Sequence, residues 1–105
     1  MVRHMIIWTL KDEFSGEEKA RIKAGIKEGL EGLHGKIPGM VRIQVMTEGL
    51  ASSNTDLMLD TLFEDEAALK GYSVHPLHVA VANEKVRPFT KIRSCFDFEE
   101  QEIPG

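Results

Sequence analysis

The segment from residue 2 to residue 10 constrains the fold most strongly, because it alternates with a period of two and carries apolar side chains on both faces. One set of alternate residues is Val2, His4, Ile6, Trp8 and Leu10, and the other is Arg3, Met5, Ile7 and Thr9. This period, with β-branched and aromatic residues, predicts a β-strand. Such a strand needs cover on both sides, so it predicts a sheet whose two faces are both buried.

The next segment has the signature of a helix that begins after residue 15. Ser15 followed by Glu18 is a capping-box pattern. Apolar residues then recur at helical spacing, at Ile22, Ile26, Leu30 and Leu33. We therefore expect a helix that runs to about residue 34 and ends at Gly35.

Three glycines form a second stripe inside this predicted helix, at Gly25, Gly29 and Gly32. Each glycine costs about 1 kcal/mol relative to alanine in a helix interior, so the stripe requires a physical reason. We expect that reason to be the close approach of a neighbouring layer to the helix backbone, and we assign the glycines no role in ligand binding.

Three more strands and two more helices are expected in the rest of the chain. Alternating apolar residues predict strands at 40–48, 56–63 and 90–98. Acidic residues at 64–66 open a short helix, and Pro76 opens another that runs to about Val86. The order is β-α-β-β-α-α-β, a ferredoxin-like α+β fold in which a four-stranded antiparallel sheet has its helices on one face. We expect one domain at 1–98 and a frayed acidic tail at 99–105.

Helices on one face leave the opposite sheet face without cover from the same chain. We expect Met5, Ile7 and Met58 on that face. An apolar sheet face of this size usually marks an interface. The sequence therefore predicts a homodimer in which two sheets pack face to face.

Composition argues against several classes of function. The formal net charge of −4 argues against nucleic acid, because phosphate binding needs a basic patch. Cys95 is the single cysteine, so neither an internal disulfide nor a cysteine metal cluster can form, and we expect a cytoplasmic location. The apolar run at residues 5–8 is too short for a signal peptide or a membrane span, so no membrane association is expected.

Tyrosine and histidine gather in residues 72–78, which read YSVHPLH. His78 falls in the first turn of the helix that Pro76 opens, where the helix dipole and burial both favour a neutral imidazole. A neutral imidazole accepts a proton at pH 7, which makes His78 a candidate general base and Tyr72 a candidate hydrogen-bond donor or acid. The same residue types also hold helix junctions together, and we interpret His75 in that structural sense.

Several stretches of the chain resemble the stress-responsive dimeric α/β-barrel (Dabb) domain family. They are HMIIWTLK at 4–11, IPGM at 37–40, FEDEAAL at 63–69, YSVHPLH at 72–78, VRP at 86–88 and FDFE at 96–99. The resemblance implies a homodimer whose two sheets close into a barrel. In a plant branch of the family, residues that match His4, Tyr72 and His78 catalyse a polyketide aldol cyclisation. The first helix here lacks the aromatic residues that line a polyketide-sized pocket, so the substrate stays open.

His4 can meet Tyr72 and His78 only if it points to the helix side of the sheet. The expected ligand-binding pocket is then lined by Ile6, Trp8, Ile22, Ile26, Leu57 and Leu59. Apolar walls with a few polar groups suit a small organic ligand. We therefore expect a small hydrophobic or carbonyl-containing ligand, with neither a cofactor nor a metal.

Two functions from different classes fit this pocket. In the first, a dimer without catalytic activity binds a small hydrophobic metabolite or acts as a stress-related structural protein. In the second, a cofactor-free cyclase, isomerase or lyase uses His78 as the base on an acidic C–H next to a carbonyl, and Tyr72 stabilises the enolate oxygen. A haem-degrading protein of the same barrel class is a third option, which needs open space beside a histidine for the porphyrin.

Overall fold

The computed structural model describes residues 1–101, and its elements follow the order expected from the sequence. They are β1 (Val2–Leu10), α1 (Gly16–Glu31), β2 (Met40–Met46), β3 (Leu57–Phe63), α2 (Glu66–Val74), α3 (Pro76–Val81), η1 (Ala82–Val86) and β4 (Thr90–Glu99). The turn η1 is π-helical and continues α3. The ferredoxin-like α+β prediction is confirmed. Within the described residues, no helix has the length and apolar character that crossing a membrane requires.

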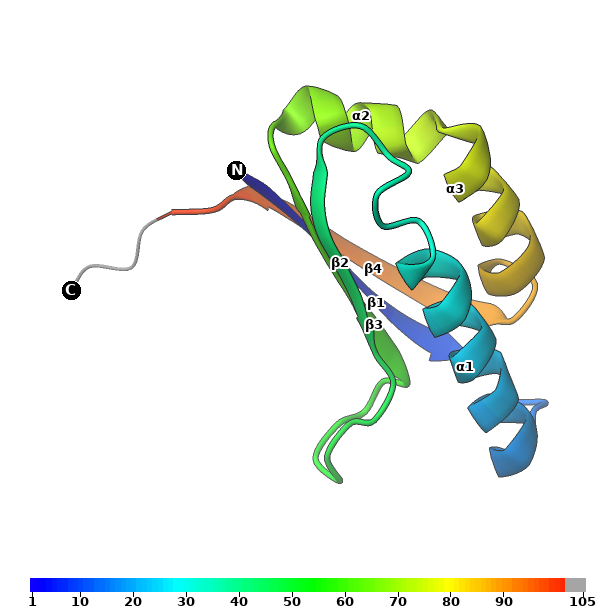
Figure 1. Ribbon diagram of the computed structural model, residues 1–105. Coiled ribbons are helices and arrows are strands. Elements are labelled where there is room, and N and C mark those ends of the chain that lie inside the picture. The colour runs from blue at the N-terminus through cyan, green and yellow to red at the C-terminus, as the bar shows by residue number, and fades with distance from the viewer. Residues whose placement is uncertain (102–105) are drawn as a thin grey trace.

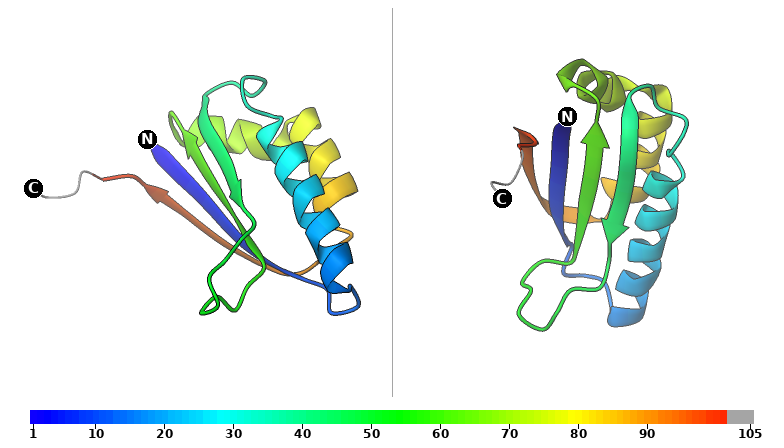
Figure 2. Two further views of the ribbon diagram at one scale, coloured as in Figure 1. Left: turned by 60° about the horizontal axis from the view of Figure 1, so that its bottom comes forward. Right: turned by 60° about the vertical axis from the view of Figure 1, so that its left-hand side comes forward.

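The four strands form one antiparallel sheet in the order β2-β3-β1-β4. Figure 1 shows all the helices on one side of this sheet. The right-hand view of Figure 2 shows the other side, where no element of residues 1–101 lies over the strands. We call this uncovered side the open face.

The strand β1 lies in the interior of the sheet, where it pairs with β3 on one side and with the edge strand β4 on the other. His4 pairs with Thr61 of β3 and with Asp97 of β4. Residues directly opposite one another in an antiparallel pair share a face. The set that contains His4 therefore points to the helices, and the set that contains Met5 points to the open face.

The hydrophobic core lies between the sheet and α1. Ile6, Trp8 and Leu10 of β1 are at most 4% exposed and pack in one cluster with Ile26 and Leu30 of α1. Burial of side chains of this size stabilises the fold by roughly 1.5–3 kcal/mol each. The helix α1 packs against β2, whereas β4 makes little contact with any helix. The sheet is consequently covered unevenly, and β4 is left exposed on its helix side.

The start of α1 is as predicted, and its end is not. Ser15 and Glu18 form the complete capping box. The helix ends at Glu31, whereas the sequence predicted residue 34. Residues 32–36 continue in tight turns whose hydrogen bonds span three residues, such as Lys36 N–H to Leu33 O at 3.0 Å. The left-handed residue Gly35, with φ of 79°, lies inside the last of these turns, between Leu33 and Lys36.

Another element approaches the glycine stripe closely at one position only, Gly29. At Gly32 an added Cβ would instead lie 2.9 Å from the backbone oxygen of Glu28, in the same helix. A Cβ atom added to Gly29 would lie 2.9 Å from Cγ1 of Val81. The same atom added to Gly25 would meet only Cδ of Lys85 at 4.0 Å. Gly29 therefore allows α3 to pack against α1, while Gly25 has no neighbour that excludes a side chain.

The pairing of β1 with β4 contains one irregularity. Thr9 lies opposite Ile92, whereas Leu10 lies opposite Thr90, so Lys91 is an extra residue on β4. A bulge of this kind bends and twists a strand locally. The Lys91 ammonium pairs with a carboxylate of the β1–α1 turn, and the ladder from Ile92 onward keeps one register.

The open face is more apolar than expected, because β4 adds two aromatic residues to it. Phe96 lies opposite Met5 and is 69% exposed. The rings of Phe96 and Phe98 have their centroids 5.5 Å apart. Met5 and Ile7 lie on this face as expected. Of the predicted acidic tail at 99–105, Glu99 belongs to β4 and residues 102–105 lie outside the described part.

We predict opposite effects of alanine at the two glycines. Gly25→Ala should raise the free energy of unfolding by about 1 kcal/mol, because it gains helix propensity without a clash. Gly29→Ala should lower the free energy of unfolding, since the new methyl group collides with Val81. Urea unfolding of both variants checks this, and an equal rise in the two would contradict the packing described here.

Candidate functional site

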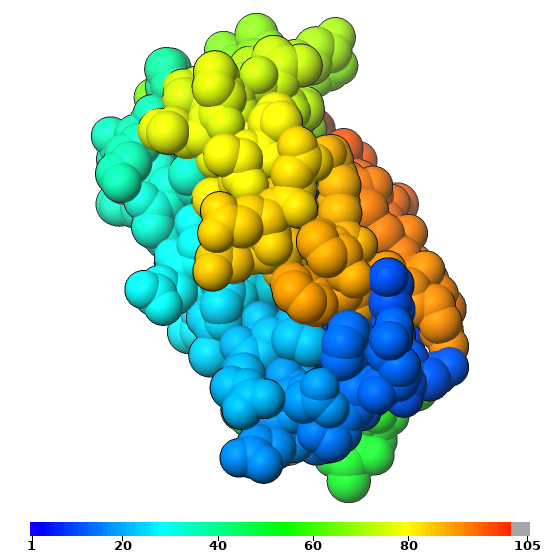
Figure 3. All heavy atoms as spheres, turned by 90° about the vertical axis from the view of Figure 1, so that its right-hand side faces the viewer, coloured from blue at the N-terminus to red at the C-terminus, as the bar shows by residue number. Residues whose placement is uncertain are grey.

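A cavity of about 840 Å³ lies between the sheet and the helices on the β1–β4 side. It occurs here because no helix packs over β4. Figure 3 shows β4, in orange and red, at the edge of the helix-covered side. The walls of the cavity include His4, Ile6, Trp8, Leu59, Tyr72 and His78. The volume is in the range of sites for small organic ligands.

The junction between α2 and α3 brings Tyr72 and His78 together. His75 ends α2 and caps α3, where its Nδ1 accepts a hydrogen bond from the backbone N–H of Leu77 at 3.1 Å. Pro76 occupies the first turn of α3. Because the chain turns here, Tyr72 of α2 and His78 of α3 face one another, with ring centroids 4.1 Å apart. His75 thus has the structural role expected for it.

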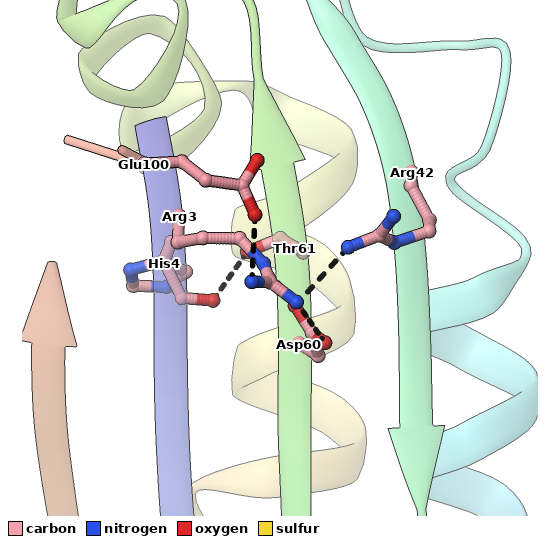
Figure 4. A network of polar contacts seen from close by, with 6 residues as sticks. All are labelled: Arg3, His4, Arg42, Asp60, Thr61 and Glu100. Carbon is pink, nitrogen blue, oxygen red and sulfur yellow. Dashed lines mark hydrogen bonds and ion pairs between the residues drawn. The ribbon is translucent and has the colours of Figure 1, made fainter. Parts of the chain in front are cut away.

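His4 reaches the same place from β1 and is 7% exposed. The hydroxyl of Thr61, on the neighbouring strand, donates a hydrogen bond to the backbone oxygen of His4 at 2.7 Å, as Figure 4 shows. The His4 ring lies edge-on to Tyr72, with centroids 5.9 Å apart. The structure thus brings the three predicted residues into one cavity wall. Their chemical roles stay predictions.

Asp97 belongs to the site, although the sequence analysis placed it only in the strand expected at 90–98 and assigned it no role. Its carboxylate lies 2.5 Å from Nδ1 of His4. A histidine whose Nδ1–H is donated to a carboxylate is fixed in orientation and presents Nε2 to its surroundings. The signal was the antiparallel pairing of the first and last strands, which sets Asp97 directly opposite His4.

The hydroxyl of Tyr72 is the buried side-chain polar atom without a hydrogen-bond partner in the described residues. Burial raises the pKa of Tyr72 above its ordinary value of 10.0, and the positive charge of Arg93 opposes this rise only in part. The phenol is therefore neutral near pH 7 and acts as a donor. An unpartnered buried donor costs roughly 1–3 kcal/mol, so it is a position that a ligand oxygen would satisfy.

His78 is held as a neutral imidazole mainly by its burial. Burial lowers the pKa of His78 below 6.5, the hydrogen bond to Ser73 O opposes this, and nearby positive charge lowers it further. The helix dipole, which the sequence analysis invoked, is not needed. Nδ1 of His78 lies 3.3 Å from the backbone oxygen of Ser73 and donates to it, which leaves Nε2 as the acceptor.

Half of the predicted apolar lining lies in the cavity wall. Ile6, Trp8 and Leu59 are there, as the sequence analysis expected. The expectation does not hold for the other three residues, which belong to or pack against the core: Ile22, Ile26 and Leu57. The physical reason is the placement of α1, which packs against β2 and leaves the space open beside β4.

The donor atoms of His4, Cys95 and Asp97 lie within 4.8 Å of one another, so a bound metal has to be considered. Two nitrogen or oxygen ligands of a tetrahedral zinc ion are roughly 3.3 Å apart. The 2.5 Å between His4 and Asp97 is instead a hydrogen-bond distance. Burial and the neighbouring Asp97 also raise the pKa of the Cys95 thiol, which opposes formation of the thiolate that metals bind. The arrangement fits a histidine–carboxylate pair better than a metal centre.

Comparison with protein families gives one match over nearly the whole chain. The model for the stress responsive A/B barrel domain matches residues 2–100. That range includes every element described above and all four polar residues of the site. No functionally curated protein matches the chain in sequence.

Solved structures support the same fold. A dimeric protein of unknown function from Bacteroides fragilis is 28% identical, with a TM-score of 0.87 over 94% of this chain and 95% of that chain. A Dabb family protein from Mesorhizobium loti is 23% identical, with a TM-score of 0.73 and coverage of 96% and 97%. A hydroxynitrile lyase from Passiflora edulis is 16% identical, with a TM-score of 0.70 and coverage of 98% and 96%. The last two identities indicate a shared fold alone.

We predict that His78 titrates below 6.5, and NMR titration of the four histidines measures this directly. Because the folded pKa is lowered, the unfolded state binds more protons as the pH falls below 6.5. The contribution of His78 to stability is therefore complete above pH 6.5 and is lost as the pH falls through the folded pKa. His78→Gln should flatten this part of the stability profile. A midpoint at or above 6.5 would refute the burial argument.

Proposed function

We propose that this chain, which belongs to the stress responsive A/B barrel domain family, binds a small hydrophobic molecule with a carbonyl group in the cavity between its sheet and its helices. The observation that carries the proposal is the buried, unpartnered hydroxyl of Tyr72. A neutral phenol is a hydrogen-bond donor, and a carbonyl oxygen is the acceptor that an apolar cavity tolerates best.

The walls of the cavity suit the rest of such a ligand. Ile6, Trp8 and Leu59 provide apolar surface from β1 and β3. The ring of His78 lies over Tyr72, and its hydrogen bond to Ser73 O is long, at 3.3 Å. A tilt of the imidazole would allow a ligand oxygen to reach the hydroxyl. In this role the protein is a small binding module of the family, acting in the cytoplasm.

A second function, catalysis without a cofactor, is favoured by the state of His78. Its neutral ring has Nε2 as a free acceptor beside the phenol. In an enolisation, Nε2 takes the proton from a carbon next to the ligand carbonyl, the C–H electron pair forms the carbon–carbon double bond of the enolate, and the C=O π pair moves to the oxygen. Tyr72 donates a hydrogen bond to the enolate oxygen so formed. In an aldol cyclisation, the enolate carbon then attacks a second carbonyl of the same ligand, and the alkoxide oxygen that forms takes back the proton held by His78.

The variant Tyr72→Phe tests whether the hydroxyl of Tyr72 binds ligand or has a structural role. The variant should keep or raise the free energy of unfolding, because it removes a buried donor that has no partner. It should at the same time weaken binding of a 4-oxoalkanoic acid or its amide about tenfold, since one hydrogen bond to the carbonyl is lost. Loss of stability with unchanged affinity would assign the hydroxyl a structural role and contradict the proposal.

His78→Gln is the matched variant for the catalytic alternative. Glutamine keeps a polar side chain of similar length but is not a base near pH 7. The rate of exchange of the ligand's α-proton for deuterium should fall on the order of a hundredfold, while affinity changes little. Exchange that is no faster with the wild-type protein than in buffer would exclude the enolisation chemistry and leave the binding function intact.

We also infer that two copies pair through their open faces. The face carries Met5, Ile7 and Phe96, and Phe96 is 69% exposed. An exposed apolar face of this kind is unusual for a monomer. The Bacteroides fragilis protein of the same fold is dimeric. Two such sheets packed face to face would cover both faces at once.

The charged residues on the open face are mutually paired, which makes its burial possible. Arg3 contacts both carboxylate oxygens of Asp60, at 3.1 and 3.0 Å, and Glu100 at 2.9 Å. Arg42 lies 3.9 Å from Asp60 on the other side. Figure 4 shows this group of two arginines and two acids spread across β1, β3 and β2. Because its charges balance, the group can be buried without leaving an isolated charge.

We predict that light scattering gives a mass of twice 11.8 kDa for the wild-type protein. Ile7→Glu should shift it to the single-chain mass, because an unpaired charge would be buried between the sheets. Val74→Glu is the matched control, since Val74 is exposed on α2, away from the open face. A single-chain mass for the wild type at micromolar concentration would rule out the dimer.

A further inference from the structure

The cavity wall contains charged residues that fall into two groups. The whole set is Glu66, Lys70, Arg87, Arg93, Asp97 and Glu99. In the first group each charge has a close partner. Glu66 pairs with Lys70 at 3.4 Å, Glu99 pairs with the N-terminal ammonium at 3.3 Å, and Asp97 lies 2.5 Å from the ring of His4.

The second group is Arg87 and Arg93, which have no acidic partner. Among residues 1–101, no carboxylate oxygen lies within 4.0 Å of either guanidinium. Arg87 donates a hydrogen bond to the neutral side chain of Asn83. Acidic residues outnumber basic ones in this chain, 17 to 13. Two unpaired cations in one cavity wall are therefore not explained by the overall composition.

Arg93 is placed toward the site by its strand. It pairs with Trp8, so it shares the helix-side face of the sheet with Trp8, and with Cys95 and Asp97 further along β4. Four residues of strand separate the backbone of Arg93 from that of Asp97, which is roughly 13 Å. The cavity thus has a negative end near His4 and a positive end near Trp8.

The guanidinium of Arg93 also lies close enough to act on both candidate catalytic groups. After burial and the charge of His4, the charges of Arg87 and Arg93 lower the pKa of His78. The charge of Arg93 also lowers the pKa of Tyr72, against the larger effect of burial. Because Tyr72, Arg87 and Arg93 line the same cavity, a single ligand can contact the phenol and an arginine together.

We propose that Arg93, assisted by Arg87, binds a carboxylate of the ligand, so that the cavity selects organic acids whose carbonyl oxygen meets Tyr72. Arginine presents parallel N–H donors that match the two oxygens of a carboxylate. The apolar chain of the acid would lie against Ile6 and Leu59. This inference rests on the proposed ligand-binding function and names the class of ligand.

The test uses two pairs of probes that differ only in charge. These are 4-oxodecanoate with 4-oxodecanamide, and 4-oxohexanoate with 4-oxohexanamide. Trp8 is the single tryptophan of the chain and lies in the cavity wall, so its fluorescence reports binding. The wild-type protein should bind at least one acid on the order of tenfold more tightly than its amide, as expected for a charge-assisted hydrogen bond.

Four variants locate the origin of this preference. Arg93→Gln should reduce the ratio of acid to amide affinity toward one by weakening the acid only, and Arg87→Gln should reduce it less. Arg93→Lys should keep most of the ratio, since it keeps the charge. Arg21→Gln removes an exposed arginine of α1 outside the cavity wall and should leave the ratio unchanged. Thermal unfolding of each variant confirms that it is folded.

The outcomes distinguish this inference from the function on which it rests. Equal affinity of acid and amide for the wild-type protein would overturn the carboxylate site and leave ligand binding intact. If the ratio of acid to amide affinity is unchanged in both Arg93→Gln and Arg87→Gln, the carboxylate site is likewise overturned while ligand binding stays intact. If none of the four probes changes Trp8 fluorescence at millimolar concentration, the ligand-binding proposal and this inference fall together.

Discussion

The antiparallel pairing of β1 with β4 determines both surfaces of the sheet at once. Because directly opposite residues share a face, the register that places Asp97 beside His4 also places Phe96 beside Met5. One set of pairs forms the polar wall of the cavity, and the other forms the apolar open face. A slip of one residue would exchange the two sets and place aromatic rings in the cavity and charges on the open face. The site and the expected dimer interface therefore depend on the same backbone hydrogen bonds.

The cavity itself is a consequence of having too few helices for four strands. The helix α1 packs against β2, α2 packs against β1, β2 and β3, and α3 packs against α1, so β4 has no helix over it. Polar residues on the helix side of β4 can then remain hydrated without disturbing the core. The candidate site lies at the border between this hydrated strand and the packed core, where Tyr72 is buried and Asp97 is exposed. A neutral histidine, a neutral phenol and ionised groups are all stable together in such a place.

Features that depend on a few neighbouring residues were predictable from the sequence. The strand period of residues 2–10, the Ser15 capping box and the structural role of His75 before Pro76 all agree with the structure. The convergence of His4, Tyr72 and His78 was expected from the family resemblance, provided that the His4 side of β1 faces the helices. Each of these features follows from local periodicity, capping or a known motif, and none requires knowledge of how distant elements pack.

Features that depend on the arrangement of whole elements were not predictable. Ile22, Ile26 and Leu57 have the apolar character of a pocket lining, yet they lie in or against the core because α1 covers the other half of the sheet. Asp97 was not recognised as a site residue, because its partner His4 is 93 residues away in the chain. The end of α1 was misplaced because the tight turns after Glu31 have the same short-range spacing as a helix.

The bulge at Lys91 separates the geometry of the site from the length of the loop that precedes β4. Beyond the bulge, the ladder from Ile92 to Glu99 is continuous, and it holds Arg93, Cys95 and Asp97 in place. Bulges accommodate an extra residue with little effect on the pairing beyond them. The connection from η1 to β4 can therefore vary in length during evolution while the facing residues of the cavity stay in register. The positions of the cavity residues on β4 are in this way independent of the length of the loop that precedes the strand.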